Sequence, residues 1–327
     1  MVNMEKYAPV VIFTYNRLAH TVKTIEALSD NCGADETEVF IYSDGWRNNE
    51  DKKKVRAVRE YLKSLDKFKK IHLIERKSNM GLADNIIDGV SSVINKYGKV
   101  IVVEDDIITS KWFLQYMNDA LVKYEGERKV MAVSGYLPPI ETEGLPQAFF
   151  SEVFECWGWG TWDRCWSKFE RNPEKLIQDT PKENIRRINI NNMVNNWQQV
   201  ILNYKHVIKT WAIFFHALII KNNGLVLNNC ANLSMNIGKD GTGENSGYEI
   251  LHDTRILSDT RVEEFPDKIE LNSLAMKYYV DYYKIQKEKY GSRAKRIIYI
   301  IKNEGIEGII KRMRGKIKKF KYRYYRS

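Results

Sequence analysis

Residues 99–106 read Lys-Val-Ile-Val-Val-Glu-Asp-Asp, four consecutive β-branched apolar residues that run directly into three carboxylates. An apolar run of this kind predicts a short strand that is buried on both faces of a sheet. Similar runs occur upstream at Val10–Phe13, Val39–Tyr42 and Ile71–Ile74. The sequence therefore contains four candidate strands of the same type within its first third.

The stretches between these strands carry apolar residues at helical spacing, which predicts helices over 19–28, 52–65 and 81–96. A further helix is predicted near 112–124 and a fifth strand at 130–134. Short apolar strands alternating with helices indicate an α/β fold, a Rossmann-like, mostly parallel sheet with helices on both faces.

The pattern changes after Gly135, where the strict alternation of strands and helices stops. The second half has an aromatic-rich segment over 149–169 and a polar helical region over 180–208. An apolar helix at 211–220, a strand at 225–227 and a glycine-rich loop at 236–247 follow. We predict one large domain over residues 1–255, with a helical extension over 256–327.

Net charge is unevenly distributed along the chain. The 327 residues carry a net charge of +10, but residues 292–327 hold thirteen Lys and Arg against Glu304 and Glu307, so this tail carries +11 and the rest −1. The tail also has an apolar stripe at helical spacing, formed by Ile306, Ile309, Ile310, Met313, Ile317 and Phe320. A basic amphipathic tail of this kind predicts attachment to an anionic membrane surface. A solvated or disordered end remains the alternative.

The composition excludes several classes of protein. No apolar run approaches the roughly 20 residues of a membrane span, and the first ten residues do not resemble a secretory signal. The four cysteines show no metal-binding spacing, which favours reduced thiols in a cytosolic protein. The near-neutral body argues against a nucleic-acid enzyme, so no nucleic-acid partner is expected.

Polar residues follow each of the four predicted strands. Because ligands of open α/β sheets bind beyond the carboxyl ends of the strands, these residues are the candidates for a binding site. They are Thr14, Tyr15, Asn16 and Arg17 after the first strand, Ser43, Asp44 and Gly45 after the second, residues 76–81 after the third, and Glu104, Asp105 and Asp106 after the fourth.

The acidic turn Glu104-Asp105-Asp106 is the strongest of these signals. Three adjacent carboxylates repel one another unless a cation neutralises them, and Mg²⁺ or Mn²⁺ accepts one or two carboxylates together with diphosphate oxygens. The alternative for such a turn is a solvated loop that caps the next helix through Thr109 or Ser110.

These segments together resemble the glycosyltransferases of the GT-A fold. The resemblance is carried by the runs 10–17 (VVIFTYNR), 43–45 (SDG), 79–82 (NMGL) and 99–106 (KVIVVEDD), and it covers roughly residues 8–245. More narrowly, the segments are similar to the animal N-acetylglucosaminyltransferase I group and to bacterial family-2-like sugar transferases, some of which are labelled haemolytic-protein-like.

The resemblance implies a nucleoside-diphosphate sugar as donor, a UDP-sugar first, and roles for individual residues. It implies that Arg17 and Asp44 contact the base, that Asp106 binds Mn²⁺ or Mg²⁺, and that Glu104 and Asp105 hold sugar and ribose hydroxyls. The remaining predicted donor-binding residues are Thr14, Tyr15, Asn79, Gly81 and Asp84. Residues 1–135 would form the nucleotide-sugar half and 136–255 the acceptor half.

The segment 155–162 (ECWGWGTW) resembles the Trp/Gly-rich acceptor-side element of these enzymes. Aromatic faces pack on sugar C–H surfaces, and glycines let the backbone approach a ligand. We therefore predict Trp157, Trp159, Trp162 and Trp211 as acceptor-binding residues. An aromatic core cluster is the alternative.

Two departures from the family pattern leave the catalytic base open. Trp211 is followed by Ala212 where inverting members have an aspartate, and the late loop lacks a glycine-threonine-histidine element. We predict Glu155 first and Asp163 second as the base, with Asp240 and Glu244 next.

The sequence predicts a divalent-metal-dependent, inverting hexosyl- or N-acetylhexosaminyltransferase acting on a glycan or lipid-linked glycan. It would be cytoplasmic and peripheral at the inner face of the membrane. The alternatives are a catalytically degenerate sugar-nucleotide-binding protein, a nucleic-acid-binding module that uses the basic tail, and a nucleotidyltransferase. Segment 14–20 has no glycine and so lacks the triphosphate loop of that last class.

Overall fold

The structure is a computed structural model that describes residues 7–238 and 256–290. Its strands are β1 (Val10–Thr14), β2 (Glu38–Ser43), β3 (Lys70–Glu75), β4 (Lys99–Glu104), β5 (Ile107–Thr109), β6 (Val130–Ser134), β7 (Ala148–Ser151), β8 (Trp159–Trp162), β9 (Leu225–Asn229) and β10 (Ser234–Asn236). Its α-helices are α1 (Leu18–Ser29), α2 (Asn49–Lys63), α3 (Leu82–Tyr97), α4 (Phe113–Lys123), α5 (Asp163–Trp166), α6 (Pro173–Asp179), α7 (Lys182–Ile188), α8 (Gln198–Tyr204), α9 (Ala212–Lys221) and α10 (Ser273–Tyr290). A 3₁₀ turn spans Ala34–Glu36.

Eight strands form one sheet in the order β3-β2-β1-β4-β8-β6-β9-β7, while β5 and β10 form a separate antiparallel pair. Strands β1 to β4 are parallel to one another. Strand β8 lies between β4 and β6 and is antiparallel to both. The strands β4 and β6 therefore run in the same direction, and their carboxyl ends lie at the same edge of the sheet.

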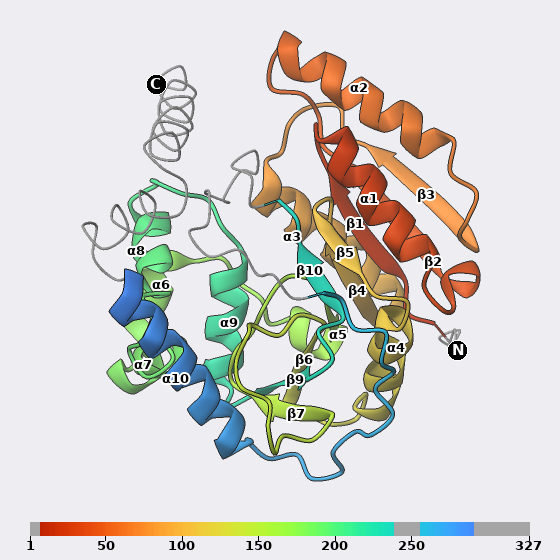
Figure 1. Ribbon diagram of the computed structural model, residues 1–327. Coiled ribbons are helices and arrows are strands. Elements are labelled where there is room, and N and C mark those ends of the chain that lie inside the picture. The colour runs from red at the N-terminus through yellow and green to blue at the C-terminus, as the bar shows by residue number, and fades with distance from the viewer. Residues whose placement is uncertain (1–6, 239–255, 291–327) are drawn as a thin grey trace.

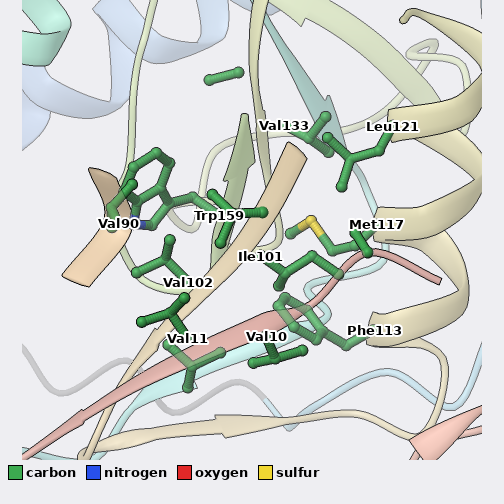
Figure 2. Packing of buried hydrophobic residues seen from close by; sticks show 14 of the residues in the cluster. Val10, Val11, Val90, Ile101, Val102, Phe113, Met117, Leu121, Val133 and Trp159 are labelled. Atoms are coloured by element: carbon green, nitrogen blue, oxygen red, sulfur yellow. The ribbon is translucent and has the colours of Figure 1, made fainter. Parts of the chain in front are cut away.

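Helices cover both faces of this sheet, because the central strands β1 and β4 are buried and apolar along nearly their whole length. Figure 2 shows Phe113, Met117 and Leu121 of α4 on one side of β1 and β4, and Val90 of α3 with Trp159 on the other. These side chains are all fully or almost fully buried. Right-handed crossovers put α1 and α2 on one face and α3 on the opposite face, since the chain reverses its direction across the sheet after β3.

Local sequence signals determine where several of these helices begin and end. Helix α2 begins after Asn48, whose side chain accepts a hydrogen bond from the backbone of Asp51. Helix α3 ends at Gly98, whose left-handed φ of 76° allows the chain to turn directly into β4. These two signals determine where α2 begins and where α3 gives way to β4.

The sequence-based expectations for the first 135 residues are confirmed element by element, with ends that differ by a few residues. The structure adds three short strands that were not predicted in the second half, namely β7, β8 and β10, and one in the first half, β5. The predicted polar helical region 180–208 is two helices, α7 and α8, separated by Ile190, Asn191 and Asn192 with positive φ.

The described part of the C-terminal extension, residues 256–290, runs along one side of the domain (Figure 1), and several of its side chains pack against the core. Before α10 the chain runs along α4, where Phe265 stacks on Tyr116 at 5.8 Å between ring centroids, and Tyr124 donates to the carbonyl of Pro266 at 2.7 Å. Helix α10 then buries Ala275 and Tyr279 in a second apolar cluster. The basic amphipathic tail predicted over 292–327 lies outside the described residues.

Within the described ranges, none of the helices combines the length and the apolar character that crossing a bilayer requires.

Histidine 216 provides a test of the core through its pH dependence. It is buried in α9 with its Nε2 2.9 Å from the carbonyl oxygen of Glu152, and burial lowers its pKa from 6.5 to about 4. Between pH 6.5 and 4, His216 is therefore protonated in the unfolded chain but neutral in the folded protein. We expect this histidine to contribute full stability above pH 6.5 and to lose about 3 kcal/mol of it as the pH falls to 4.

Urea unfolding at a series of pH values measures this contribution against a His216→Gln variant. The variant should show a shallower loss of unfolding free energy between pH 6.5 and 4, because the remaining titrating groups are common to both proteins. Parallel curves for the two proteins would contradict the assignment.

Candidate functional site

The two strands at the centre of the N-terminal half, β1 and β4, are neighbours, but α1, which leaves β1, and α3, which leads into β4, lie on opposite faces of the sheet. Such a reversal point leaves a crevice beyond the carboxyl ends of the two strands, which is where ligands of α/β sheets bind. Arg17 follows β1, and Asp105 and Asp106 follow β4. The fold thus brings three of the predicted donor-binding residues into one place.

Arg17 forms ion pairs with both carboxylates of the acidic turn. Its Nη2 contacts Oδ1 of Asp105 and lies 2.9 Å from Oδ2 of Asp106. Asp105 and Asp106 are only 5% and 6% exposed. The cluster therefore holds one positive and two negative charges out of water, with the partly buried Glu104 beside it. This excess of negative charge is costly without a further cation.

The ionisation of these groups reflects the burial of the cluster. Burial raises the pKa of Asp105 above its ordinary value, although Arg17 acts in the opposite direction. Burial alone would lower the pKa of Arg17, but Asp105 and Asp106 outweigh that effect and raise it, so the guanidinium stays charged. Oδ2 of Asp105 and Nη1 of Arg17 are both buried without a hydrogen-bond partner among the described residues. The site therefore offers an acceptor and a donor to a ligand.

The segment around β10 lies directly over the acidic turn. The backbone of Ile237 donates to the carbonyl of Asp106 at 2.8 Å, and β10 pairs with β5 just beyond it. A Cβ added to Gly238 would lie 2.0 Å from Oδ2 of Asp106 and 2.9 Å from Nη1 of Arg17. Only glycine allows the backbone to approach the carboxylate this closely. The rest of the late loop, with Asp240 and Glu244, lies outside the described residues.

The chemistry of this cluster fits a divalent ion that takes part of its ligands from a substrate. The described residues contain no group of three or more His, Cys, Asp or Glu side chains arranged around one point. Mg²⁺ and Mn²⁺ at diphosphate sites need only one or two carboxylates, because phosphate oxygens and water complete the shell. Asp106 and the unpartnered oxygen of Asp105 would be the carboxylates for such an ion.

Asp44, after β2, holds the loop that follows β3. Its two carboxylate oxygens accept four hydrogen bonds at 2.8–3.0 Å, from the backbones of Gly45, Met80 and Gly81 and from the side chain of Asn79. A carboxylate has about four acceptor positions, so all of them are used within the protein. In this structure Asp44 acts as the scaffold that fixes Asn79 and Gly81 at the edge of the site.

Arg59 fixes the same region from behind, although it was not among the predicted site residues. This buried side chain of α2 donates to the carbonyls of Ser43, Asp44 and Arg76 at 2.8–3.2 Å and forms an ion pair with Glu75. It therefore joins the carboxyl ends of β2 and β3. Its position on the apolar stripe of α2, beside Val55, Val58 and Leu62, is the signal that could have identified it in the sequence.

The residues after β1 are tied to the first turn of α2. Tyr15 donates through its hydroxyl and Asn16 through its amide to the two carboxylate oxygens of Asp51, both at 2.8 Å. Burial, with Asp51 adding to the effect, raises the pKa of Tyr15 far above its usual range, so its hydroxyl stays protonated. The hydroxyl of Thr14 is buried without a hydrogen-bond partner in the described ranges.

Asp84, in the first turn of α3, joins the two halves of the domain. Its carboxylate forms ion pairs with Arg171, at 2.9 Å, and with Lys209. Asp84 and Arg171 border an open hollow of about 560 Å³, which is lined by Met80, Asp84, Ile87, Asp88, Ser91, Phe169 and Arg171. Asp84 therefore lies next to Gly81 at the rim of the site, with its charge compensated by the second half of the chain.

Glu155, the first candidate for the base, lies at the same edge of the sheet as the acidic turn. Its backbone carbonyl accepts from Ser134 at the end of β6, and β6 ends at the same edge as β4. The neighbouring thiol of Cys156 senses the charges of Glu104, Glu155 and Asp106, which with burial raise its pKa well above the ordinary value. The partly buried thiol of Cys156 is therefore within the electrostatic influence of both Glu155 and the acidic turn.

Asp163 does not share this location. It follows β8, and its backbone donates to the carbonyl of Gly98, immediately before β4. Because Lys99 pairs with Trp162 and Val102 with Trp159, Asp163 lies beyond the amino end of β4. The full length of that strand separates it from Asp106, so the structure removes Asp163 as a candidate base.

Three of the four tryptophans predicted to bind an acceptor lie in the core instead. Trp159, Trp162 and Trp211 are 0%, 2% and 4% exposed, and Trp159 stacks on Trp211 at 5.0 Å between centroids. The aromatic-core alternative is therefore correct for these three. Trp157 is only partly buried and packs on Tyr136 at 4.5 Å, at the edge where β6 ends.

Comparison with known proteins finds a family match in the N-terminal part of the chain. Residues 10–126 match the family model "Glycosyl transferase family 2". The matched segment contains all four polar strand ends and the Arg17–Asp105–Asp106 cluster. It supports the transferase class predicted from the sequence, and with the observed sheet it confirms the GT-A fold class. The narrower resemblance to the N-acetylglucosaminyltransferase I group is not confirmed.

Solved structures show only distant likenesses to the chain. The mannosyltransferase PcManGT from Pyrobaculum calidifontis, in complex with GDP-Man and Mn²⁺, is 14% identical with a TM-score of 0.40, over 66% of this chain and 69% of that one. TarS 1–349 from S. aureus is 13% identical with a TM-score of 0.33, over 53% of this chain and 48% of that one. These values are too low to carry an argument about the site. No curated protein matches the chain.

The loss of stability on substitution should distinguish Trp159, in the core, from Trp157, at the edge of the site. Trp159→Ala should lower the free energy of unfolding by about 3–5 kcal/mol, because it opens a cavity in a fully buried aromatic cluster. Trp157→Ala should cost about 1 kcal/mol, since its side chain is already partly exposed. Urea unfolding measures both values, and equal losses for the two variants would contradict the placement of Trp157 at the surface.

Proposed function

We propose that the protein is a divalent-metal-dependent glycosyltransferase that moves a sugar from a nucleoside diphosphate to a hydroxyl group of an acceptor glycan. The observation that carries this proposal is the buried cluster of Arg17, Asp105 and Asp106 at the reversal point of the sheet. The family match over residues 10–126 supports it, because it covers the whole cluster.

The donor's diphosphate, together with a metal ion, would interact with the two buried groups of this cluster that have no hydrogen-bond partner among the described residues, Oδ2 of Asp105 and Nη1 of Arg17. Asp106, with Asp105, would hold Mn²⁺ or Mg²⁺, and when bound the ion stabilises the negative charge of the diphosphate leaving group. Arg17 has a buried Nη1 without a hydrogen-bond partner and is the cation available to a phosphate oxygen. Glu104, at the end of β4, would then be close enough to orient a hydroxyl of the donor.

The nucleoside would lie along the loop that Asp44 and Arg59 hold in place. Asn79 and Gly81 are fixed there by Asp44, and Tyr15 lies beside them, with Arg47 bridging Asn79 and Tyr15. We propose uracil as the base of the donor, and so a UDP-sugar, following the resemblance of these segments. Because all four acceptor positions of Asp44 are used, it would position the loop that contacts the base. It could contact the base directly only if one of these hydrogen bonds opens.

The reaction we propose is a direct displacement at the anomeric carbon, with inversion. The acceptor hydroxyl forms the new C–O bond and gives its proton to the carboxylate of Glu155, while the bond from the anomeric carbon to the diphosphate oxygen breaks. Its electron pair leaves with the nucleoside diphosphate. General-base assistance of this type typically contributes about 10²–10⁴-fold to the rate.

The acceptor would bind at the edge formed by Tyr136, Glu155 and Trp157, where β6 ends. A partly buried tryptophan beside a tyrosine presents an aromatic face to sugar C–H groups. We propose a hexose or N-acetylhexosamine as the transferred sugar, and a glycan or a lipid-linked glycan as the acceptor.

Asp106→Asn tests the donor site. The variant keeps the Arg17–Asp105 ion pair but removes one of the two carboxylates for the metal. UDP-, GDP- and dTDP-sugars are screened by thermal shift in the presence of Mn²⁺. The sugar nucleotide that binds should raise the melting temperature of the wild type by several degrees. In Asp106→Asn this shift should vanish and hydrolysis of the matching donor should fall by about 10²–10³-fold.

Asp163→Asn is the matched control, because this aspartate lies beyond the opposite end of β4. It should retain both the nucleotide-dependent shift and the hydrolysis. If no nucleotide sugar stabilises the wild type, the catalytic proposal is wrong. Wild-type binding without any hydrolysis or transfer would instead favour the degenerate sugar-nucleotide-binding protein.

We further propose that residues 292–327 attach the enzyme to the inner face of a membrane. The support is the local charge of +11 combined with the apolar stripe in that stretch of sequence. Each Lys or Arg near an anionic surface contributes about 1 kcal/mol, so the segment is sufficient for reversible binding.

Sedimentation with vesicles tests this attachment in the full chain. Wild-type protein should bind vesicles containing phosphatidylserine and not vesicles of phosphatidylcholine alone, and binding should weaken with salt. Replacing Lys311, Arg312, Lys316, Lys318 and Lys319 by Gln should reduce binding at least tenfold. Five Gln replacements at exposed basic residues of α2 and the loop after it, Lys53, Lys54, Arg56, Lys63 and Lys67, are the control. Equal losses in both proteins would exclude a specific role for the tail.

A further inference from the structure

Helix α10 places a phenol against the candidate base. The hydroxyl of Tyr283 donates to Oε1 of Glu155 at 3.3 Å, although the two residues are 128 positions apart in the sequence. Burial and the charge of Glu155 raise the pKa of Tyr283 well above its ordinary value. The phenol therefore stays protonated and is the donor of this hydrogen bond.

The position of Tyr283 is determined by the packing of the whole helix. Ala275, Tyr279 and Tyr283 recur every four residues and so lie on one face of α10. Ala275 and Tyr279 are fully buried, and Tyr279 donates to the side chain of Asn228 in β9 at 3.3 Å. This row of side chains leads along the helix to Glu155.

Both ends of α10 are also held by hydrogen bonds to the domain. Before its first turn, the backbone of Asn272 donates to the carbonyl of Phe150 in β7 at 2.9 Å. In its last turn, Lys287 donates to the carbonyl of Asn192 at 3.1 Å. A helix anchored at both ends and along one face holds its side chains within a narrow range of positions.

Glu155 is itself fixed from the opposite side. Its carbonyl accepts from the hydroxyl of Ser134, and the next residue, Cys156, is next to the acidic turn. Among the described residues, Cys156, Tyr279 and Tyr283 are titratable groups that the charge of its carboxylate affects. Of the two tyrosines, Tyr283 has a hydrogen bond to the carboxylate, whereas the hydroxyl of Tyr279 is directed to Asn228.

We propose that Tyr283 is a positioning residue for Glu155, so that helix α10 of the C-terminal extension forms part of the acceptor site. This inference rests on the proposed function, in which Glu155 accepts the proton of the acceptor hydroxyl. A phenol that donates to one carboxylate oxygen selects one orientation of the side chain. It also favours the ionised form, which is the form that can accept a proton.

Removal of this donor has a defined effect on pH dependence. Without the hydrogen bond, the ionised carboxylate is less favoured and the pKa of Glu155 rises. A larger fraction of the enzyme then has a protonated base at a given acidic pH. The acid limb of the kcat profile should therefore move to higher pH, while binding of the donor at the other side of the crevice is unaffected.

Tyr283→Phe in the full chain, with Tyr279→Phe as the matched control, tests the proposal. Both variants remove one phenolic hydroxyl from the same face of α10. With the donor found in the thermal-shift screen, Tyr283→Phe should lower kcat about tenfold and move the acid limb up by about one pH unit. Its KM for the donor and its nucleotide-dependent thermal shift should match the wild type, and Tyr279→Phe should leave the pH profile unchanged.

A second measurement does not require turnover. In protein labelled with ¹³C-glutamate, the carboxyl resonance of Glu155, assigned by its absence in Glu155→Gln, should titrate at higher pH in Tyr283→Phe than in the wild type. Identical titrations, or a pH profile that moves equally in Tyr279→Phe, would overturn the positioning role. If the wild type binds no nucleotide sugar, the proposed function fails, while the NMR titration still decides whether Tyr283 acts on Glu155.

Discussion

In the function we propose, the ion pair between one arginine and two buried aspartates determines what the N-terminal half of this protein binds. The parallel strands β1 and β4 bring Arg17 and the Asp105–Asp106 turn together, and the sheet shields them from water. In such a place a charge imbalance is much more costly than at the surface, so the cluster favours any ligand that supplies a cation and phosphate oxygens together. The surrounding contacts, from Asp44 and Arg59 to Gly238, hold the chain around this cluster.

The donor side of the site could be predicted from the sequence because its information is local. Each strand that leads to it is a short apolar run, and each polar residue that matters comes directly after such a run. Neighbouring parallel strands then bring the strand ends together without further assumptions. What the sequence did not reveal was the pairing within the cluster. It also did not show that the carboxylate of Asp44 is fully engaged by the loop at 79–81.

The acceptor side was less predictable because it depends on contacts between distant segments. The WGWGTW run reads equally well as a platform or as a core, and only the antiparallel position of β8 decides that Trp159 and Trp162 point inward. Asp163 and Glu155 flank the same run, yet β8 carries them to opposite ends of the sheet. Tyr283 lies in a tyrosine-rich helix whose sequence gives no indication of its partner. In each case the role of the residue depends on where a strand or helix from a distant part of the sequence packs, β8 for the tryptophans and Asp163 and α10 for Tyr283.

The position of β8 has a consequence for how the chain folds as it is synthesised. Strand β4 is hydrogen-bonded to β1 on one side and to β8 on the other, but β8 is made more than fifty residues after β4. Until Trp162 has left the ribosome, the open edge of an apolar strand is exposed, a state that invites pairing with other chains. The segment that matches the family model ends before β8, so it would carry the same exposed edge if expressed alone. We therefore expect the smallest unit that folds without aggregating to extend well beyond the residues of the proposed donor site.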